Sequence, residues 1–167
     1  HLAAEKCRNL GRLLLEPGRC LVMGDLWPPS LLWSRKKIRI IDWEFAHYGR
    51  PLQDLAHFCA HCIMHQAMAP AGKSQLYHEI WIRTVEGYRD AAGRQYAELL
   101  NSVEKEWFMV HAGAEILTRT IGAFADSYLF KNQLQGNLAE KMVQEAIGLM
   151  SGNISAGEHP FTKTVLD

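Results

Sequence analysis

The sequence has no excess of charge of either sign, because its 18 Lys and Arg residues are balanced by 18 Asp and Glu residues. Without a basic excess or cluster, we expect neither nucleic acid nor a membrane surface as a partner. No apolar run approaches the roughly 20 residues that a membrane-spanning helix needs. Hydrophobic residues make up 48% of the chain and charged residues 22%, a composition typical of a globular protein.

A secretory signal is also lacking, because residues 1–20 contain no unbroken apolar segment followed by a small-residue cleavage site. The chain has few cysteines, and the four are scattered (Cys7, Cys20, Cys59 and Cys62). We therefore expect reduced thiols and a cytoplasmic location. The first residue is His1 rather than methionine, so we also expect a fragment of a longer protein.

The first third of the chain predicts one helix and three short strands. An apolar stripe predicts a helix over residues 2–15, which Pro17 and Gly18 end. Strands are predicted at 20–23, 31–33 and 38–41, and the charged residues between the last two indicate an exposed hairpin tip.

From residue 52 onward the pattern is helical. The helices are predicted at 52–68, 74–90, a short segment from 94, 102–130 and 138–150. Seven apolar residues at steps of three and four predict the buried face of the 102–130 helix: Val103, Trp107, Val110, Ala114, Leu117, Ile121 and Phe124. The fold class is therefore α+β, mainly helical, with a hairpin segment packed on a helical bundle. We expect one domain over 1–152 and a flexible tail over 153–167.

Two aspartates follow predicted strands near the start of the chain. Asp25 comes after Gly24 and precedes Pro28 and Pro29, which we expect to prevent a helix and stiffen the loop. A carboxylate on a stiff loop is well placed to accept a proton or to orient a hydroxyl group.

Asp42 ends the next predicted β-ribbon, and Glu44 lies two residues further on. In an extended segment, residues two apart point to the same side, so both carboxylates can hold one Mg²⁺ that phosphates complete. Asp54 begins a helix, where it can cap the helix or brace a neighbouring loop. On spacing alone, ordinary turn and cap residues explain the same acids.

The combined pattern is more specific. The segments MGDLWPPS, IIDWE and YGRPLQDLA, between Leu21 and Phe58, resemble the catalytic core of the protein-kinase-like small-molecule kinases. This family includes aminoglycoside phosphotransferases, choline kinases and methylthioribose kinases. The helical remainder is similar to the family's C-terminal lobe, so the resemblance implies that lobe of a protein-kinase-like fold.

The resemblance implies a role for each acid. Asp25 matches the catalytic aspartate that orients or deprotonates the acceptor hydroxyl, and Asp42 matches the aspartate that holds Mg²⁺ against the β- and γ-phosphates of ATP. Glu44 is a possible second metal ligand, and Asp54 matches a structural aspartate that braces the catalytic loop. The implied cofactors are Mg²⁺ and ATP, and the implied partner is a small molecule with a hydroxyl group.

The chain departs from the family pattern at two positions. Met23 stands where the family usually has a loop-supporting histidine; methionine fills that volume but does not hydrogen-bond similarly. Ser30 stands where most members have a metal-binding asparagine, and its hydroxyl can still bind the metal. Methylthioribose kinases resemble this chain in having serine there together with Asp-x-Glu.

A larger departure is the lack of an N-terminal lobe. Phosphoryl transfer in this fold needs a loop over the phosphates and a lysine on a strand, and only 24 residues precede Asp25. We expect the chain alone to bind nucleotide poorly. Two hypotheses stay open: a kinase lobe that acts within a complete protein, and a non-catalytic remnant that binds a partner. In either case, we expect the missing lobe or a second copy to cover the hairpin side.

Histidines and tryptophans raise two further questions. His57, His61 and His65 share one helix face with Cys62 nearby, and two such histidines can bind zinc. No established zinc motif accompanies them, and a helix that faces the acceptor cleft explains the same residues, so zinc is not expected.

Trp27 is a possible acceptor contact. The alternative is that Trp27, with Trp33 and Trp43, packs the hairpin onto the helices.

Overall fold

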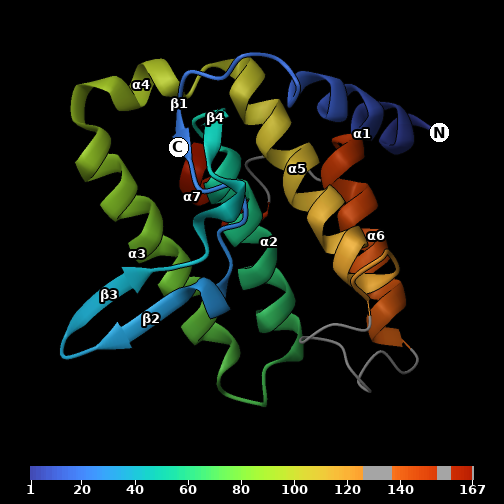
Figure 1. Ribbon diagram of the computed structural model, residues 1–167. Coiled ribbons are helices and arrows are strands. Elements are labelled where there is room, and N and C mark those ends of the chain that lie inside the picture. The colour runs from blue at the N-terminus through green and yellow to red at the C-terminus, as the bar shows by residue number, and fades with distance from the viewer. Residues whose placement is uncertain (126–136, 154–158, 167) are drawn as a thin grey trace.

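The computed structural model describes residues 1–125, 137–153 and 159–166 (Figure 1). Its helices are α1 (Leu2–Leu13), α2 (Gln53–Met68), α3 (Ser74–Ala92), α4 (Tyr96–Leu99), α5 (Ser102–Thr120), α6 (Asn137–Ser151) and α7 (Pro160–Leu166). Its strands are β1 (Cys20–Val22), β2 (Leu31–Ser34), β3 (Lys37–Ile40) and β4 (His47–Gly49). The fold class is α+β and mainly helical, as predicted.

The strands form two separate antiparallel pairs. Strands β2 and β3 form the predicted hairpin, whose two loop residues, Arg35 and Lys36, both have positive φ. That backbone geometry suits a two-residue hairpin turn, because its twist matches that of the strands. Strand β1 pairs with β4, which the sequence pattern did not indicate because β4 has only three residues and its partner is distant in the chain.

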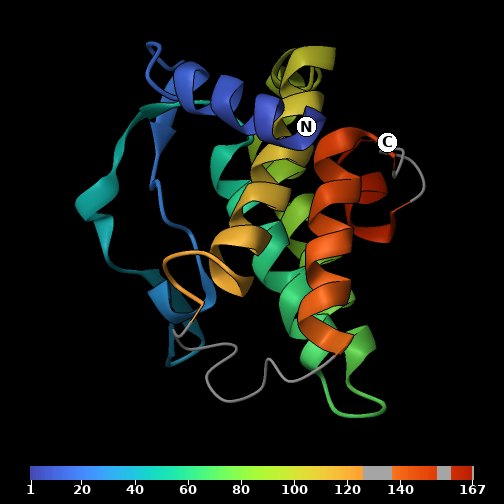
Figure 2. The same cartoon turned by 90° about the vertical axis from the view of Figure 1, so that its right-hand side faces the viewer.

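Helix α2 lies at the centre of the helical bundle. It packs against α3 on one side and α5 on the other, and α6 packs against α5 and α1 (Figure 1). Eleven of its sixteen residues are buried, among them Leu55, Phe58 and Ile63. Figure 2 shows the strands and their connecting loops on one side of the helices. The strands therefore form an outer layer, and α2 is the core element beneath it.

Helix α5 is shorter than predicted, and its buried face is different. It ends at Thr120, while residues 126–130 of the predicted helix lie outside the described residues. Val110 is buried, but Val103, Ile121 and Phe124 are exposed, so the seven-residue stripe is not the core face as a whole. The face that packs on α2 and α6 includes Phe108, Ala112 and Ile116.

Part of the predicted tail is helical. Residues 160–166 form α7, in which Phe161 and Val165 are buried against the core. The Trp81 indole on α3 donates a hydrogen bond to the Phe161 carbonyl. Phe161 and Val165 lie one helical turn apart, so they share the face of α7 that packs on the core next to α3. Residues 154–158 of the tail lie outside the described residues.

Within the described ranges, no helix combines the length and the apolar character that crossing a membrane would require.

Candidate functional site

The loop that carries Asp25 lies against the segment that carries Asp42 and Glu44. Strand β1 leads into this loop, and β4, which follows Glu44, pairs with β1. Gly24 adopts φ +89°, and a Cβ there would lie 2.5 Å from the Phe45 carbonyl oxygen. Only glycine fits so close an approach, and the two acidic segments therefore lie side by side.

Asp54 holds the start of this loop. Its two carboxylate oxygens accept hydrogen bonds from the backbone N–H groups of Met23 (2.7 Å) and Gly24 (2.9 Å). Charge-assisted bonds to backbone N–H groups are strong, so α2 fixes the backbone immediately before Asp25. The Met23 side chain is buried beneath the same loop.

The prediction that Pro28 and Pro29 prevent helical structure is wrong, because Pro28–Ser30 form one 3-10 turn. Proline is accepted at the first positions of a helix, where its missing N–H has no helical partner. The buried Ser30 hydroxyl donates to the Trp27 carbonyl over 2.7 Å. The Ser30 N–H donates to the same carbonyl over 3.0 Å and closes the turn, while the hydroxyl bond directs the side chain to Trp27.

Asp42 and Glu44 are both exposed carboxylates. They do not lie in the extended segment that the sequence predicted, because Asp42 has left-handed dihedrals (φ 72°, ψ 50°) and Glu44 lies in the 3-10 turn Trp43–Phe45. A left-handed residue other than glycine costs about 1 kcal/mol or more, and aspartate tolerates this conformation better than most residues. Such strain is found preferentially at functional sites.

The Asp25 carboxylate meets two basic side chains that the sequence pattern did not connect with it. Its Oδ1 atom lies 2.9 Å from Nε2 of His57 on α2 and 3.8 Å from Nη2 of Arg119 on α5. The contact with His57 is the main cause that lowers the pKa of Asp25, and it outweighs the opposing effect of partial burial. Asp25 is therefore a carboxylate at neutral pH, held in place from two helices.

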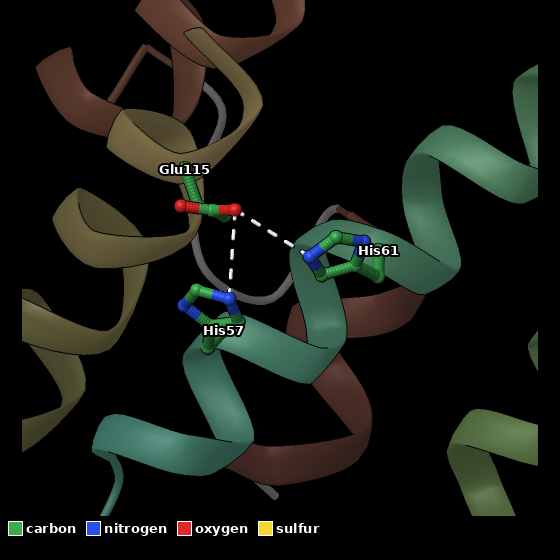
Figure 3. A group of neighbouring side chains, drawn as sticks. All are labelled: His57, His61 and Glu115. Atoms are coloured by element: carbon green, nitrogen blue, oxygen red, sulfur yellow. Dashed lines mark ion pairs between the residues drawn. The ribbon is translucent and has the colours of Figure 1, made fainter. Parts of the chain in front are cut away.

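Glu115 on α5 extends this cluster inward. Its Oε1 atom lies 3.5 Å from His57 Nε2 and 3.4 Å from His61 Nε2 (Figure 3). Arg119 Nε donates a hydrogen bond to the same oxygen over 2.6 Å. Burial alone would raise the pKa of Glu115, but contacts with His61, His57 and Arg119 prevail and lower it to about 2. Burial lowers the pKa of His61 to about 4.

The row of metal-binding candidates on α2 separates into two parts. His57 and His61 face Glu115, whereas the His65 ring stacks on Tyr77 with 5.2 Å between ring centroids. Cys62 is buried, which raises the pKa of its thiol to about 12 and disfavours the thiolate form that binds metals. No signal in the sequence linked Glu115 to these histidines, because it lies on another helix.

The three tryptophans differ in their surroundings. The Trp27 ring lies 5.2 Å from the Arg119 guanidinium and 6.1 Å from the His61 ring, so it packs on the inner cluster. Trp33 and Trp43 are 70% and 47% exposed. The alternative in which all three rings pack the hairpin onto the helices is wrong for these two.

Comparison with known proteins supports the resemblance. Residues 2–100 match the model of the phosphotransferase enzyme family. The chain is 30% identical over 141 residues to methylthioribose kinases of Geobacillus thermodenitrificans (strain NG80-2) and Geobacillus sp. (strain WCH70). Each alignment covers 73% of this chain and 34% or 33% of the relative, so the chain spans about a third of their length. This chain belongs to the phosphotransferase enzyme family.

Proposed function

We propose that this chain is the C-terminal lobe of an ATP-dependent kinase that phosphorylates a hydroxyl group of a small molecule. The observation that carries the proposal is the placement of the Asp25 loop, which Asp54 anchors and which lies against the segment with Asp42 and Glu44. Family membership supports the same reaction class.

In the proposed reaction, Asp25 orients the acceptor hydroxyl and takes its proton as transfer proceeds. The hydroxyl oxygen forms a bond to the γ-phosphorus, the bond from that phosphorus to the β–γ bridging oxygen breaks, and ADP leaves. Because the pKa of Asp25 is lowered, positioning is a larger part of its role than proton abstraction. His57 is a positioning residue, since it holds the carboxylate from α2.

Asp42 and Glu44 are the proposed Mg²⁺ ligands. Both are exposed carboxylates two positions apart, Asp42 directly before a 3-10 turn and Glu44 within it, and carboxylate oxygens suit this ion. When bound, Mg²⁺ neutralises charge on the β- and γ-phosphates. Ser30 stays a predicted third ligand; to serve, its hydroxyl would have to rotate away from the Trp27 carbonyl.

The relatives' name suggests the first acceptor to test, which is methylthioribose. Apolar side chains on the strand layer support the proposal that a further lobe covers it: Leu21, Leu32, Trp33, Ile38 and Tyr48 are all more than 40% exposed. A lobe on this side would also supply the groups that grip ATP.

The second candidate function is a non-catalytic binding module. Met23 in place of histidine and the occupied Ser30 hydroxyl are the observations that favour it.

The test uses a polypeptide of the relatives' length that carries this chain, with Mg-ATP and methylthioribose or a panel of other small hydroxyl compounds. Asp25→Asn should lower kcat by about 10²–10⁴-fold without changing the circular dichroism spectrum. Asp90→Asn, an exposed aspartate on α3, is the matched control and should retain full turnover. Turnover of Asp25→Asn equal to that of the control would contradict the catalytic role. A parent protein that phosphorylates none of the compounds would favour the binding module.

A further inference from the structure

The buried group His57, His61 and Glu115 has the composition of a metal site. His57 and His61 lie one turn apart on α2, and Glu115 faces them from α5 (Figure 3). One potential ligand atom from each residue lies within 4.8 Å of the other two. Two imidazoles and a carboxylate are a donor set that binds zinc and related transition metals.

The two distances from Glu115 to the imidazoles match the ligand spacing around a metal ion and are long for charge-assisted hydrogen bonds. Charge-assisted hydrogen bonds span roughly 2.7–2.9 Å, whereas Glu115 Oε1 lies 3.5 Å and 3.4 Å from the two imidazole nitrogens. Zinc binds nitrogen and oxygen at about 2.0–2.2 Å with tetrahedral angles, which separates its ligand atoms by roughly 3.3–3.5 Å. The two distances from Glu115 match that separation, and the ligand atoms of the two histidines lie within 4.8 Å of each other.

The neighbouring groups supply an outer shell. Arg119 donates to Glu115 Oε1 over 2.6 Å and so fixes the orientation of the carboxylate, as outer-shell donors do in metal sites. When both imidazoles are neutral, the charges of Asp25, Glu115 and Arg119 sum to −1. This net negative charge favours a cation between His57, His61 and Glu115. A proton on His57 is the competing way to supply positive charge.

We propose that His57, His61 and Glu115 bind one divalent transition metal of the zinc class, with a fourth position open to water. This site is distinct from the Mg²⁺ site proposed at Asp42 and Glu44, because imidazole nitrogen selects transition metals over Mg²⁺. The proposal of this transition-metal site does not depend on phosphotransferase activity. Metal on His57 Nε2 would take this atom from Asp25, so binding would release the Asp25 carboxylate from its contact with α2.

The test titrates the chelator-treated 167-residue chain with Co²⁺ and then displaces it with Zn²⁺. We expect one equivalent of Co²⁺, the visible absorption of a four-coordinate ion, and no near-ultraviolet thiolate band. His61→Ala and the nearly isosteric Glu115→Gln should each weaken binding about tenfold or more, on the scale of losses at metal sites. His65→Ala, one turn further along α2, is the matched control and should bind as the parent does.

A second measurement needs no variant and so does not depend on how the variants fold. In the ¹⁵N-histidine spectrum of the parent chain, Zn²⁺ should shift the ring nitrogens of His57 and His61 most among the eight histidines. The proposal is overturned if Co²⁺ gives no visible band at one equivalent, if a thiolate band shows that cysteines hold the ion, or if the zinc-dependent shifts fall on other histidines.

Discussion

At the scale of single residues, the notable feature is that one carboxylate, Asp25, is held by groups from two helices. His57 on α2 and Arg119 on α5 both approach its Oδ1 atom, while Asp54 fixes the backbone before it. An isolated loop aspartate would sample many rotamers. Here the same contacts favour the ionised form of Asp25 and restrict its position. A residue that positions a substrate requires this kind of preorganisation.

His57→Ala should raise the pKa of Asp25, because the contact with His57 is the main cause that lowers it. The measurement is a ¹³C titration of the Asp25 carboxyl carbon by NMR. His65→Ala is the control and should leave the titration unchanged.

The pH dependence of stability follows from the same shift. A lowered folded-state pKa means that Asp25 stabilises the fold above its unfolded-state pKa of about 3.9. That contribution is lost as the pH falls through the lower folded-state value. His57→Ala should therefore flatten the dependence of unfolding free energy on pH in this acidic range. Identical Asp25 titrations in parent and variant would contradict the assigned cause.

At the scale of elements, the docking of α7 on α3 is a contact between parts of the chain that are far apart in sequence. Phe161 and Trp81 are both buried, with 6.5 Å between their ring centroids, and the indole nitrogen donates to the Phe161 carbonyl. Burial of a large aromatic side chain is a major source of stability, so α7 should be part of the cooperative core.

Phe161→Ala should lower the free energy of unfolding by about 3–5 kcal/mol, because it leaves a cavity against Trp81. The measurement is urea denaturation followed by tryptophan fluorescence. Lys163→Ala, which changes an exposed side chain on the same helix, should cost far less. Equal losses in the two variants would mean that α7 does not contribute through its buried face.

At the scale of the whole molecule, Glu104 connects the strand layer to the helices. It is 2% exposed at the start of α5, and it pairs with Arg19 before β1 and Arg50 after β4. Its own N–H is capped by the Asn101 side chain over 2.9 Å. These pairs lie at the end of the β1–β4 ribbon and therefore tie the strand layer to α5.

Glu104→Gln should lower the free energy of unfolding by about 3 kcal/mol, because it breaks a buried ion pair. This value is at the lower end for such a change, since the half-exposed Arg19 side chain can turn to solvent when its partner is lost. The same denaturation measurement applies. Glu98→Gln, an exposed glutamate on α4, is the control and should be nearly neutral. A loss no larger than that of the control would show that the buried carboxylate is not what connects the two layers.

The sequence by itself determined the hairpin tip, the central helix and the family, and it placed Asp25, Asp42 and Asp54 at the ends of elements. These features depend on residues close together in the chain, whose turn propensities and periodicity can be read directly. The predicted roles of these acids stay predictions.

Only the tertiary structure decided which distant side chains meet. Glu115 joins His57 and His61, β4 pairs with β1, and α7 docks on α3, while Trp33 stays exposed. Each of these outcomes depends on how helices and strands pack across the molecule. Local periodicity shows which face of an element is apolar, but it does not show which other element that face will meet.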